Sequence, residues 1–431
     1  MKLHGGQVAA LSAFVNSLKL MPGMVFETPD RAVASKLSDQ ILKAPPWKNY
    51  IDEADLFNII WRAAYLGTIA YPNDVSGPLN QLDGGQAANR LISSISEALE
   101  EIPSAIEIFI PLNGIGDLQQ AEITLTEKVS LIDNAHSEEV SAFLGAVKPS
   151  NDLFHMLGAR RASGPTRRLR YLKVRETGLA DDNADSQVMR SALAETKHLV
   201  FVALATGAFS LAFSSRRWDM RSNADDIPCL VVERKQKGPV VHGVAIPYDL
   251  SHFLQRLQFK EPLQVIDYQP GKGLLTSGMR AASNAAEVHQ AVTGLLHTAS
   301  RFSSLNSPDA VSIRAAMEWY VDSSATSNES VAFLQRCIGL EALLGSDGGR
   351  RDVTDRLADR YAYLLGKTES ERGTLRRAFK GMYSHRSDVV HGRASKLLSA
   401  HKTASLESAD MLLKCTWAEM HNVLKANTTL S

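Results

Sequence analysis

The periodicity of the apolar residues changes near residue 275, and this change limits the folds open to the chain. Toward the C-terminus, apolar side chains recur with the spacing of amphipathic helices. Six such segments follow one another over residues 285–302, 309–322, 328–344, 353–365, 375–391 and 405–425. Before residue 275, helical segments are mixed with the alternation typical of strands. We therefore expect a multidomain protein, with an α+β region over residues 1–275 and an all-α bundle over residues 276–431.

The first region carries both kinds of pattern. Helices are predicted over residues 8–20, 51–66, 86–101 and 185–203. Strands are predicted over residues 105–111, 123–132 and 168–175, and a hairpin over residues 227–234 and 240–248. No internal repeat and no low-complexity tract is present, so the region does not resemble a solenoid or a linker.

Charge excludes one class of function. Lys plus Arg and Asp plus Glu both total 47, so the formal net charge is zero. Such a chain does not coat nucleic acid through overall charge. Residues 331–431 nevertheless carry 16 basic and 11 acidic residues, a net of +5, which leaves −5 on the rest. This asymmetry is a mild indication that the C-terminal part meets an anion, although ordinary variation also accounts for it.

The cysteines and the longest apolar stretch indicate the cellular compartment in which the protein is expected. The three cysteines (Cys229, Cys337 and Cys415) are far apart and in no metal-binding spacing, which favours a reducing compartment over a disulfide framework. We expect Cys337 and Cys415 to be core residues. The uncharged stretch 198–215 is only about long enough to span a bilayer, and we interpret it as a buried helix or strand. The first residues make a poor signal peptide. We therefore expect a cytoplasmic protein that contacts no membrane.

A basic run over residues 160–175 contains six Arg residues and one Lys residue around Tyr171. Such a run could follow a phosphate backbone. It also alternates like the solvated face of a strand, and we favour that second interpretation.

Common catalytic motifs are absent: the sequence has no Walker A loop, no G-x-S-x-G elbow and no H-E-x-x-H pair. We expect no metal and no cofactor. One C-terminal stretch is different, because Arg386 and His391 lie five residues apart near the end of a predicted helix, just before Gly392. Another predicted helix carries Glu341 among apolar residues, and a charge in such a place usually has a partner. We consider two partners for it, Arg386 and Arg360.

Three segments together resemble a known family. They are 333–345 (FLQRCIGLEALLG), 353–360 (VTDRLADR) and 383–392 (YSHRSDVVHG). In this combination they are similar to the Apea-like branch of the HEPN superfamily, and the resemblance covers about residues 310–425. The first 275 residues resemble no family that we can name.

The resemblance implies a small helical bundle that dimerises and, in many members, cleaves RNA without a metal ion. The family's active pair falls on Arg386 and His391. Ser387 occupies the polar position that often follows the Arg, and Asp388 is a further contributor with less support. Asp388 or Glu341 could hold Arg386 in place. Members act in toxin–antitoxin, abortive-infection and antiviral systems, whereas others have lost catalysis and bind partners.

The residue types suit the implied chemistry. His moves protons near neutral pH, and Arg offers a planar fork of donors to phosphate oxygens. Five residues on an ideal helix turn the chain by about 140°, so Arg386 and His391 of one chain point differently. A homodimer that brings two such helices together could combine both pairs in one cleft.

The leading hypothesis is thus an RNA-cleaving effector with Glu341, Arg386, Ser387, Asp388 and His391 at its site. In this hypothesis the region 1–275 senses a trigger or restrains the nuclease. The alternative is an inactive HEPN module that dimerises, serves as a scaffold or binds RNA. A third idea, a different enzyme within residues 1–275, has no motif behind it.

Overall fold

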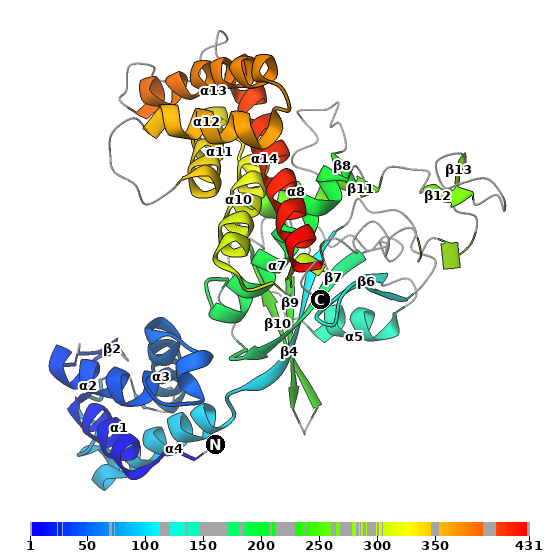
Figure 1. The fold of residues 1–431 in the computed structure, drawn as a ribbon. Helices are drawn as coiled ribbons and strands as arrows, with labels where there is room; N and C mark the ends of the chain where they lie inside the picture. Colours follow the sequence, from blue (N-terminus) through cyan, green and yellow to red (C-terminus); the bar gives the residue numbers. More distant parts are fainter. Residues whose placement is uncertain are drawn as a thin grey trace. The chain divides into compact units, whose positions relative to one another are not determined.

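Figure 1 shows the computed structural model of the chain. It describes residues 2–23, 25–27, 29–68, 71–72, 74–112, 121–133, 137–146, 170–180, 184–206, 209–211, 229–235, 238–259, 264–267, 278–281, 284, 286–287, 290, 299, 301–303, 305–345, 353–390 and 402–428. The chain forms two compact units. Unit 1 comprises Met1–Ile108, Arg175–Ala192 and Leu230–Val244, and unit 2 comprises Phe109–Val174, Leu193–Cys229 and Ala245–Ser431.

Helices follow a mixed α+β half, as the sequence predicts. The predicted boundary at residue 275 lies inside unit 2, in a stretch outside the described residues, so its position stays a prediction. The strands extend beyond it, however. Strand β13 (Gly278–Ala281) pairs antiparallel with β12 (Gln264–Asp267), so the expectation that strands stop at residue 275 is wrong.

Unit 1 begins with a helical part. Its elements are α1 (Gly5–Ser17), β1 (Lys19–Met21), β2 (Val25–Phe26), α2 (Arg31–Leu42), η1 (Trp47–Asn49), α3 (Glu53–Thr68), β3 (Gly77–Pro78), η2 (Leu82–Gly85) and α4 (Gln86–Glu100). The three short strands form a sheet in the order β2-β1-β3. The buried indole of Trp47 donates from Nε1 to the Leu99 carbonyl at 2.8 Å, which joins η1 to the end of α4.

The helices expected in this part are present over α1, α3 and α4, with ends shifted by a few residues. The apolar side chains Leu91, Ile95 and Leu99 lie on one face of α4 and are buried, at most 6% exposed. Helix α2 was not expected. It has an identifiable start signal, because the side chain of Asp30 accepts a hydrogen bond from the Ala32 backbone N–H at 2.8 Å.

The main sheet has six strands in the order β10-β9-β4-β7-β6-β5. They are β4 (Ser104–Pro111), β5 (Glu122–Thr124), β6 (Val129–Asp133), β7 (Arg170–Gly178), β9 (Cys229–Lys235) and β10 (Gly238–Val244). The single strand expected over residues 123–132 is wrong. It is an antiparallel hairpin of β5 and β6, with Ile123 opposite Leu131, because Thr126 Oγ1 accepts from the backbone N–H groups of Lys128 and Val129 and makes a turn.

Strand β7 contradicts the solvated face expected for the basic run. Arg170 and Lys173 are buried, at 8% and 6% exposed. Arg170 Nε lies 3.4 Å from the Asp133 carboxylate, and Lys173 Nζ lies 2.7 Å from that of Glu122. Carboxylates on β6 and β5 thus neutralise these cations, which lets the strand be buried on both faces. Residues 160–168 lie outside the described residues.

The remaining elements of this half are α5 (Glu138–Ala146), α7 (Gln187–Ala205), β8 (Phe209–Leu211), α8 (Tyr248–Gln255) and β11 (Leu257–Phe259). The apolar stretch that begins at residue 198 lies in the buried second half of α7 and in β8, as far as it is described. In the described part of the chain, no helix combines the length and apolar character needed to cross a membrane.

The C-terminal helices of unit 2 are α10 (Pro308–Ala325), α11 (Glu329–Leu344), α12 (Val353–Leu365), α13 (Glu369–Val390) and α14 (Lys402–Thr428), coloured yellow to red in Figure 1. They match five of the six predicted helical segments, and α12 has the predicted ends. Most of the first segment, 285–302, lies outside the described residues. Ser307 caps α10 by accepting from the Ala310 N–H at 3.2 Å, with Pro308 in the first turn.

The bundle packs around a shared apolar core that includes Phe333, Cys337, Phe379 and Cys415, so the two cysteines are core residues as predicted. Helix α11 lies against α10, α12, α13 and α14. A glycine on α11 allows α10 and α14 to approach it closely. A Cβ atom on Gly339 would lie 3.0 Å from a Leu412 methyl carbon on α14 and 3.0 Å from Trp319 Cβ on α10.

Candidate functional site

Helix α13 positions the residues of the predicted site. It begins six residues before its predicted start because Thr368 and Glu371 form a capping box. Thr368 Oγ1 accepts from the Glu371 N–H, and the Glu371 carboxylate accepts from the Thr368 N–H, at 3.2 and 3.1 Å. Arg386 lies in the penultimate turn of the helix, which ends at Val390. His391 lies outside the described residues.

Arg386 binds Glu341, which lies in the last turn of α11. Arg386 Nε is 2.7 Å from Glu341 Oε1, and Nη2 donates to Oε2 at 3.3 Å. This is a bidentate pair along one edge of the guanidinium. Both side chains are about a third exposed, at 31% and 30%. The pair uses two of the five N–H donors of Arg386, so the edge formed by Nη1 and Nη2 keeps donors without a partner among the described residues, and these could meet a second anion.

Tyr383 supports this pair from one turn earlier on α13. Its hydroxyl donates to Glu341 Oε1 at 2.7 Å, and its ring lies 5.6 Å from the Arg386 guanidinium carbon. The ring also stacks on Phe379, at 5.7 Å between centroids. Burial, followed by the hydrogen bond to Glu341, raises the pKa of Tyr383 well above its usual value of 10. The phenol is therefore a stable donor that fixes the Glu341 carboxylate.

Cys337 lies one turn before Glu341 on α11 and is fully buried. Burial raises the pKa of its thiol from 9.0 to about 12. A thiol of this kind is neutral near pH 7, and only the thiolate is a nucleophile. Cys337 is thus part of the packing behind the Glu341–Arg386 pair and no reactive group.

Of the two predicted partners of Arg386, the structure brings Glu341 to it. No hydrogen bond or ion pair joins Arg386 to Asp388 within the described residues, and Ser387 is exposed. The alternative pairing of Glu341 with Arg360 is wrong. Arg360 Nη1 donates instead to the carbonyls of Leu344 and Gly345, both at 2.7 Å, because the end of α11 leaves carbonyl groups without helical partners.

Tyr383 is not among the predicted site residues, although it belongs to the segment 383–392 that carries the resemblance. Its signal is the spacing. Tyr383 and Arg386 are three residues apart in a predicted helix, which places both on one face. A phenol on that face could have been expected to contact the same carboxylate.

A groove of about 630 Å³ lies among the helices of the same bundle. Residues of α10, α11, α12 and α14 line it: Asp309, Ser312, Ile313, Leu343, Leu344, Gly345, Arg360, Tyr363, Leu364, Glu419, Asn422, Val423 and Ala426. Its size is within the range of small-molecule sites, and its lining mixes apolar and charged groups. No sequence motif predicts this groove.

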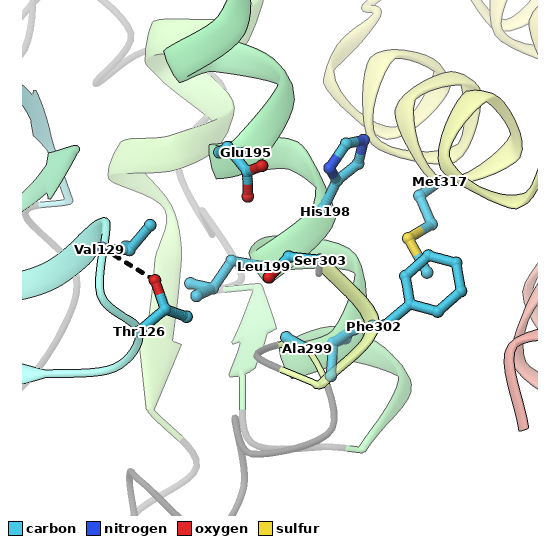
Figure 2. A pocket seen from close by; sticks show the side chains of 10 residues that line it. Thr126, Val129, Glu195, His198, Leu199, Ala299, Phe302, Ser303 and Met317 are labelled. Carbon is cyan, nitrogen blue, oxygen red and sulfur yellow. Dashed lines mark hydrogen bonds between the residues drawn. The ribbon is translucent and has the colours of Figure 1, made fainter. Parts of the chain in front are cut away.

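A second hollow, shown in Figure 2, is lined by residues of α7 and α10, by Thr126 just before β6 and Val129 at its start, and by Ala299, Phe302 and Ser303. Its volume is about 10 Å³, room for one water molecule at most. His198 lies beside it, with Nε2 3.1 Å from Glu318 Oε1. The preceding residue, Lys197, binds Asp322 at 2.8 Å, so the two contacts join α7 to α10. A hollow of this size holds no substrate, and we assign it a structural role.

No group of three or more potential metal ligands occurs in the part of the chain that the structure describes. Comparison with known proteins found no matching family model, no similar curated protein and no similar solved structure. The HEPN resemblance therefore remains a prediction from the motif residues.

Proposed function

We propose that the chain is a metal-independent HEPN endoribonuclease in which Arg386 and His391 carry the reaction. The observation that best supports the proposal is the state of Arg386. Its guanidinium is fixed on one edge by Glu341 and supported by the Tyr383 ring, and in the part of the chain that the structure describes the other edge has donors without a partner. An oriented guanidinium with a free edge is suited to a phosphate that gains charge in a transition state.

In the proposed reaction, the ribose 2′-oxygen attacks the adjacent phosphorus and the bond from phosphorus to the 5′-oxygen breaks. His391 takes the proton from the 2′-hydroxyl or delivers one to the departing 5′-oxygen. Arg386 donates hydrogen bonds to the non-bridging oxygens, where charge accumulates. The products are a 2′,3′-cyclic phosphate and a 5′-hydroxyl end, so no water is consumed in this step.

The proposed active assembly is a homodimer, because one helix cannot aim residues five apart at the same point. Two copies of α13 side by side would supply two Arg386 and two His391 side chains to one cleft. We further propose that the protein acts in the cytoplasm as an antiviral, abortive-infection or toxin-type effector. The region 1–275 would bind a trigger or restrain the nuclease.

The test is incubation of the purified full chain with total RNA in the presence of EDTA, followed by analysis of the fragment ends. We expect cyclic-phosphate and 5′-hydroxyl ends from the wild type and none from His391→Ala or Arg386→Ala. Expression of the wild type should be toxic, and either substitution should relieve the toxicity. Cleavage or toxicity that survives both substitutions would refute the proposal.

A second candidate is a non-catalytic HEPN module that dimerises or binds RNA. The pairing of Arg386 with Glu341 favours it, since a bidentate ion pair gives Arg386 a complete structural role without any substrate. This candidate predicts a stable dimer and no EDTA-resistant cleavage. The wild type should then cleave no RNA, and Arg386→Ala should alter only stability or dimerisation.

A further inference from the structure

The groove lined by α10, α11, α12 and α14 differs in charge from the Arg386 site. Its rim carries two carboxylates, Asp309 and Glu419, and one guanidinium, Arg360. Within the described residues, neither carboxylate has a hydrogen bond or an ion pair. Two carboxylates near the carbonyl end of α11 disfavour a phosphate there. They accept hydrogen bonds readily from N–H groups of a neutral ligand.

Tyr363 gives the groove an aromatic surface. It is 67% exposed, a large fraction for an aromatic residue in a helix of this bundle. The guanidinium carbon of Arg372 lies 4.6 Å from its ring centroid, and Arg372 Nε is itself held by the Gly366 carbonyl at 3.1 Å. One face of the phenol ring is thus covered by a fixed cation. The remaining exposed face can stack a planar ligand, as aromatic side chains do with bases of single-stranded RNA.

Arg360 adds a directed pair of donors. Among the described residues, Arg360 donates two hydrogen bonds, both from Nη1, to the carbonyls of Leu344 and Gly345. The edge formed by Nε and Nη2 therefore has no partner among the described residues. A guanidinium edge of this kind fits two adjacent acceptors, such as O6 and N7 of guanine. The neighbouring carboxylates fit the adjacent N–H donors that the same base carries on another edge.

The groove and the Arg386 site share the last turn of α11. Glu341 holds Arg386, while Leu344 and Gly345, three and four residues later, line the groove. Glu341 and Leu344 are three residues apart on α11, so they are neighbours on the helix, about 5–6 Å apart at Cβ; Gly345 is the residue directly after the helix. The two sites therefore lie at the same end of α11.

We propose that this groove binds a base of single-stranded RNA, with guanine preferred. The inference rests on the proposed function for its biological meaning, because a base held here would set which phosphate meets Arg386. Tyr363 stacks on the base, Arg360 donates to its acceptors, and Glu419 or Asp309 accepts from its N–H groups. Arg386 would then bind the phosphate of the nucleotide, and the groove would bind its base.

The test measures binding by fluorescence anisotropy, with the full chain carrying His391→Ala so that the probe is not cleaved. The probes are short fluorescein-labelled single-stranded RNAs that contain guanine, adenine or an abasic position at one site. We expect Tyr363→Leu to weaken binding of the guanine probe about tenfold, the usual effect of losing one stacked base. The matched control is Tyr65→Leu. Tyr65 is also an exposed tyrosine in a helix, at 55% exposure, but it belongs to unit 1, whereas Tyr363 belongs to unit 2. Tyr65→Leu should leave binding unchanged.

Glu419→Gln should reduce the preference for guanine over adenine, and the abasic probe should bind the His391→Ala parent and its Tyr363→Leu variant alike. Equal affinity of the guanine probe for the parent and for Tyr363→Leu would overturn the proposal. A loss of equal size in Tyr65→Leu would overturn it as well. Because binding is measured without cleavage, failure of the nuclease proposal leaves this result intact. If the protein cleaves RNA but its RNA affinity does not depend on Tyr363, only the proposed base binding in the groove is refuted, and the nuclease proposal stands.

Discussion

Arg386 and Glu341 form a bidentate ion pair between α13 and α11, with Arg386 Nε 2.7 Å from Oε1 and Nη2 3.3 Å from Oε2. The pair orients the guanidinium, because Glu341 binds the Nε–Nη2 edge and the Nη1–Nη2 edge keeps donors for a substrate phosphate. A flexible arginine would have to lose side-chain entropy when it met a phosphate, and here much of that cost is met during folding. The geometry thus links a stability contact to the proposed chemistry.

Arg386→Lys tests the value of the fork. Lysine keeps the charge but offers a point donor with no second edge. If Arg386 stabilises the transition state, kcat of EDTA-resistant RNA cleavage should fall by about 10²–10³. The free energy of unfolding should fall by less than about 1 kcal/mol, because the pair is a third exposed.

The matched control is Arg377→Lys on the same helix. Arg377 is exposed, and among the described residues its one side-chain hydrogen bond is to Thr374 Oγ1, one turn away, at 3.3 Å. This variant should keep full activity and stability. A similar loss of kcat in both variants, measured with a defined RNA, would show that α13 charge in general, and not Arg386 in particular, supports cleavage.

Tyr383→Phe removes the hydroxyl that fixes Glu341 and keeps the ring beneath Arg386. The lost hydrogen bond has a charged acceptor, so unfolding free energy should drop by about 1–2 kcal/mol in urea titration. Activity should fall mainly in kcat, because a loosened Glu341 lets Arg386 move. Tyr361→Phe is the control. Tyr361 is a buried tyrosine of the same core, and its hydroxyl has no hydrogen-bond partner among the described residues. Equal stability of Tyr383→Phe and wild type would contradict the role given to this contact.

The helices of the bundle could be predicted because their apolar stripes are regular. Helix α12 has its predicted ends, and α11 begins directly after Asn328, whose side chain accepts from two backbone N–H groups. Features that depend on turns or on distant partners could not be predicted in this way. The hairpin of β5 and β6 needs the Thr126 turn, and the burial of Lys173 needs the carboxylate of Glu122, which lies 51 residues away in the chain.

The candidate site shows the same division. The sequence indicated that Glu341 needs a cationic partner, but Arg360 and Arg386 fit the requirement equally well. Only the structure separates them, because Arg360 is bound to the carbonyls at the end of α11. The groove around Tyr363 gave no signal, since residues from four helices meet there without any shared motif.

Gly339 and Gly381 give opposite predictions for the same substitution. A Cβ at Gly339 meets Trp319 Cβ at 3.0 Å, close to the backbone of α10, which cannot move cheaply. A Cβ at Gly381, on the exposed side of α13, has nothing within 4 Å. Gly381→Ala should therefore stabilise the protein by roughly 0.5–1 kcal/mol through reduced chain entropy. Gly339→Ala should be less stable than Gly381→Ala by about 1–3 kcal/mol in urea unfolding. The reverse order would show that α10 and α11 are not packed this closely.

The buried thiol of Cys337 predicts a loss of stability in alkali. Burial raises its pKa from 9.0 to about 12, so between these values the unfolded chain releases a proton that the folded protein keeps. The unfolded state then binds fewer protons, and the unfolding free energy falls as pH rises from 9 toward 12. Cys337→Ala removes this contribution. Unfolding free energies measured by urea titration below and above pH 9 should fall less steeply in the variant than in the wild type. Parallel pH dependences in the two proteins would show that Cys337 titrates normally and is not enclosed by the bundle.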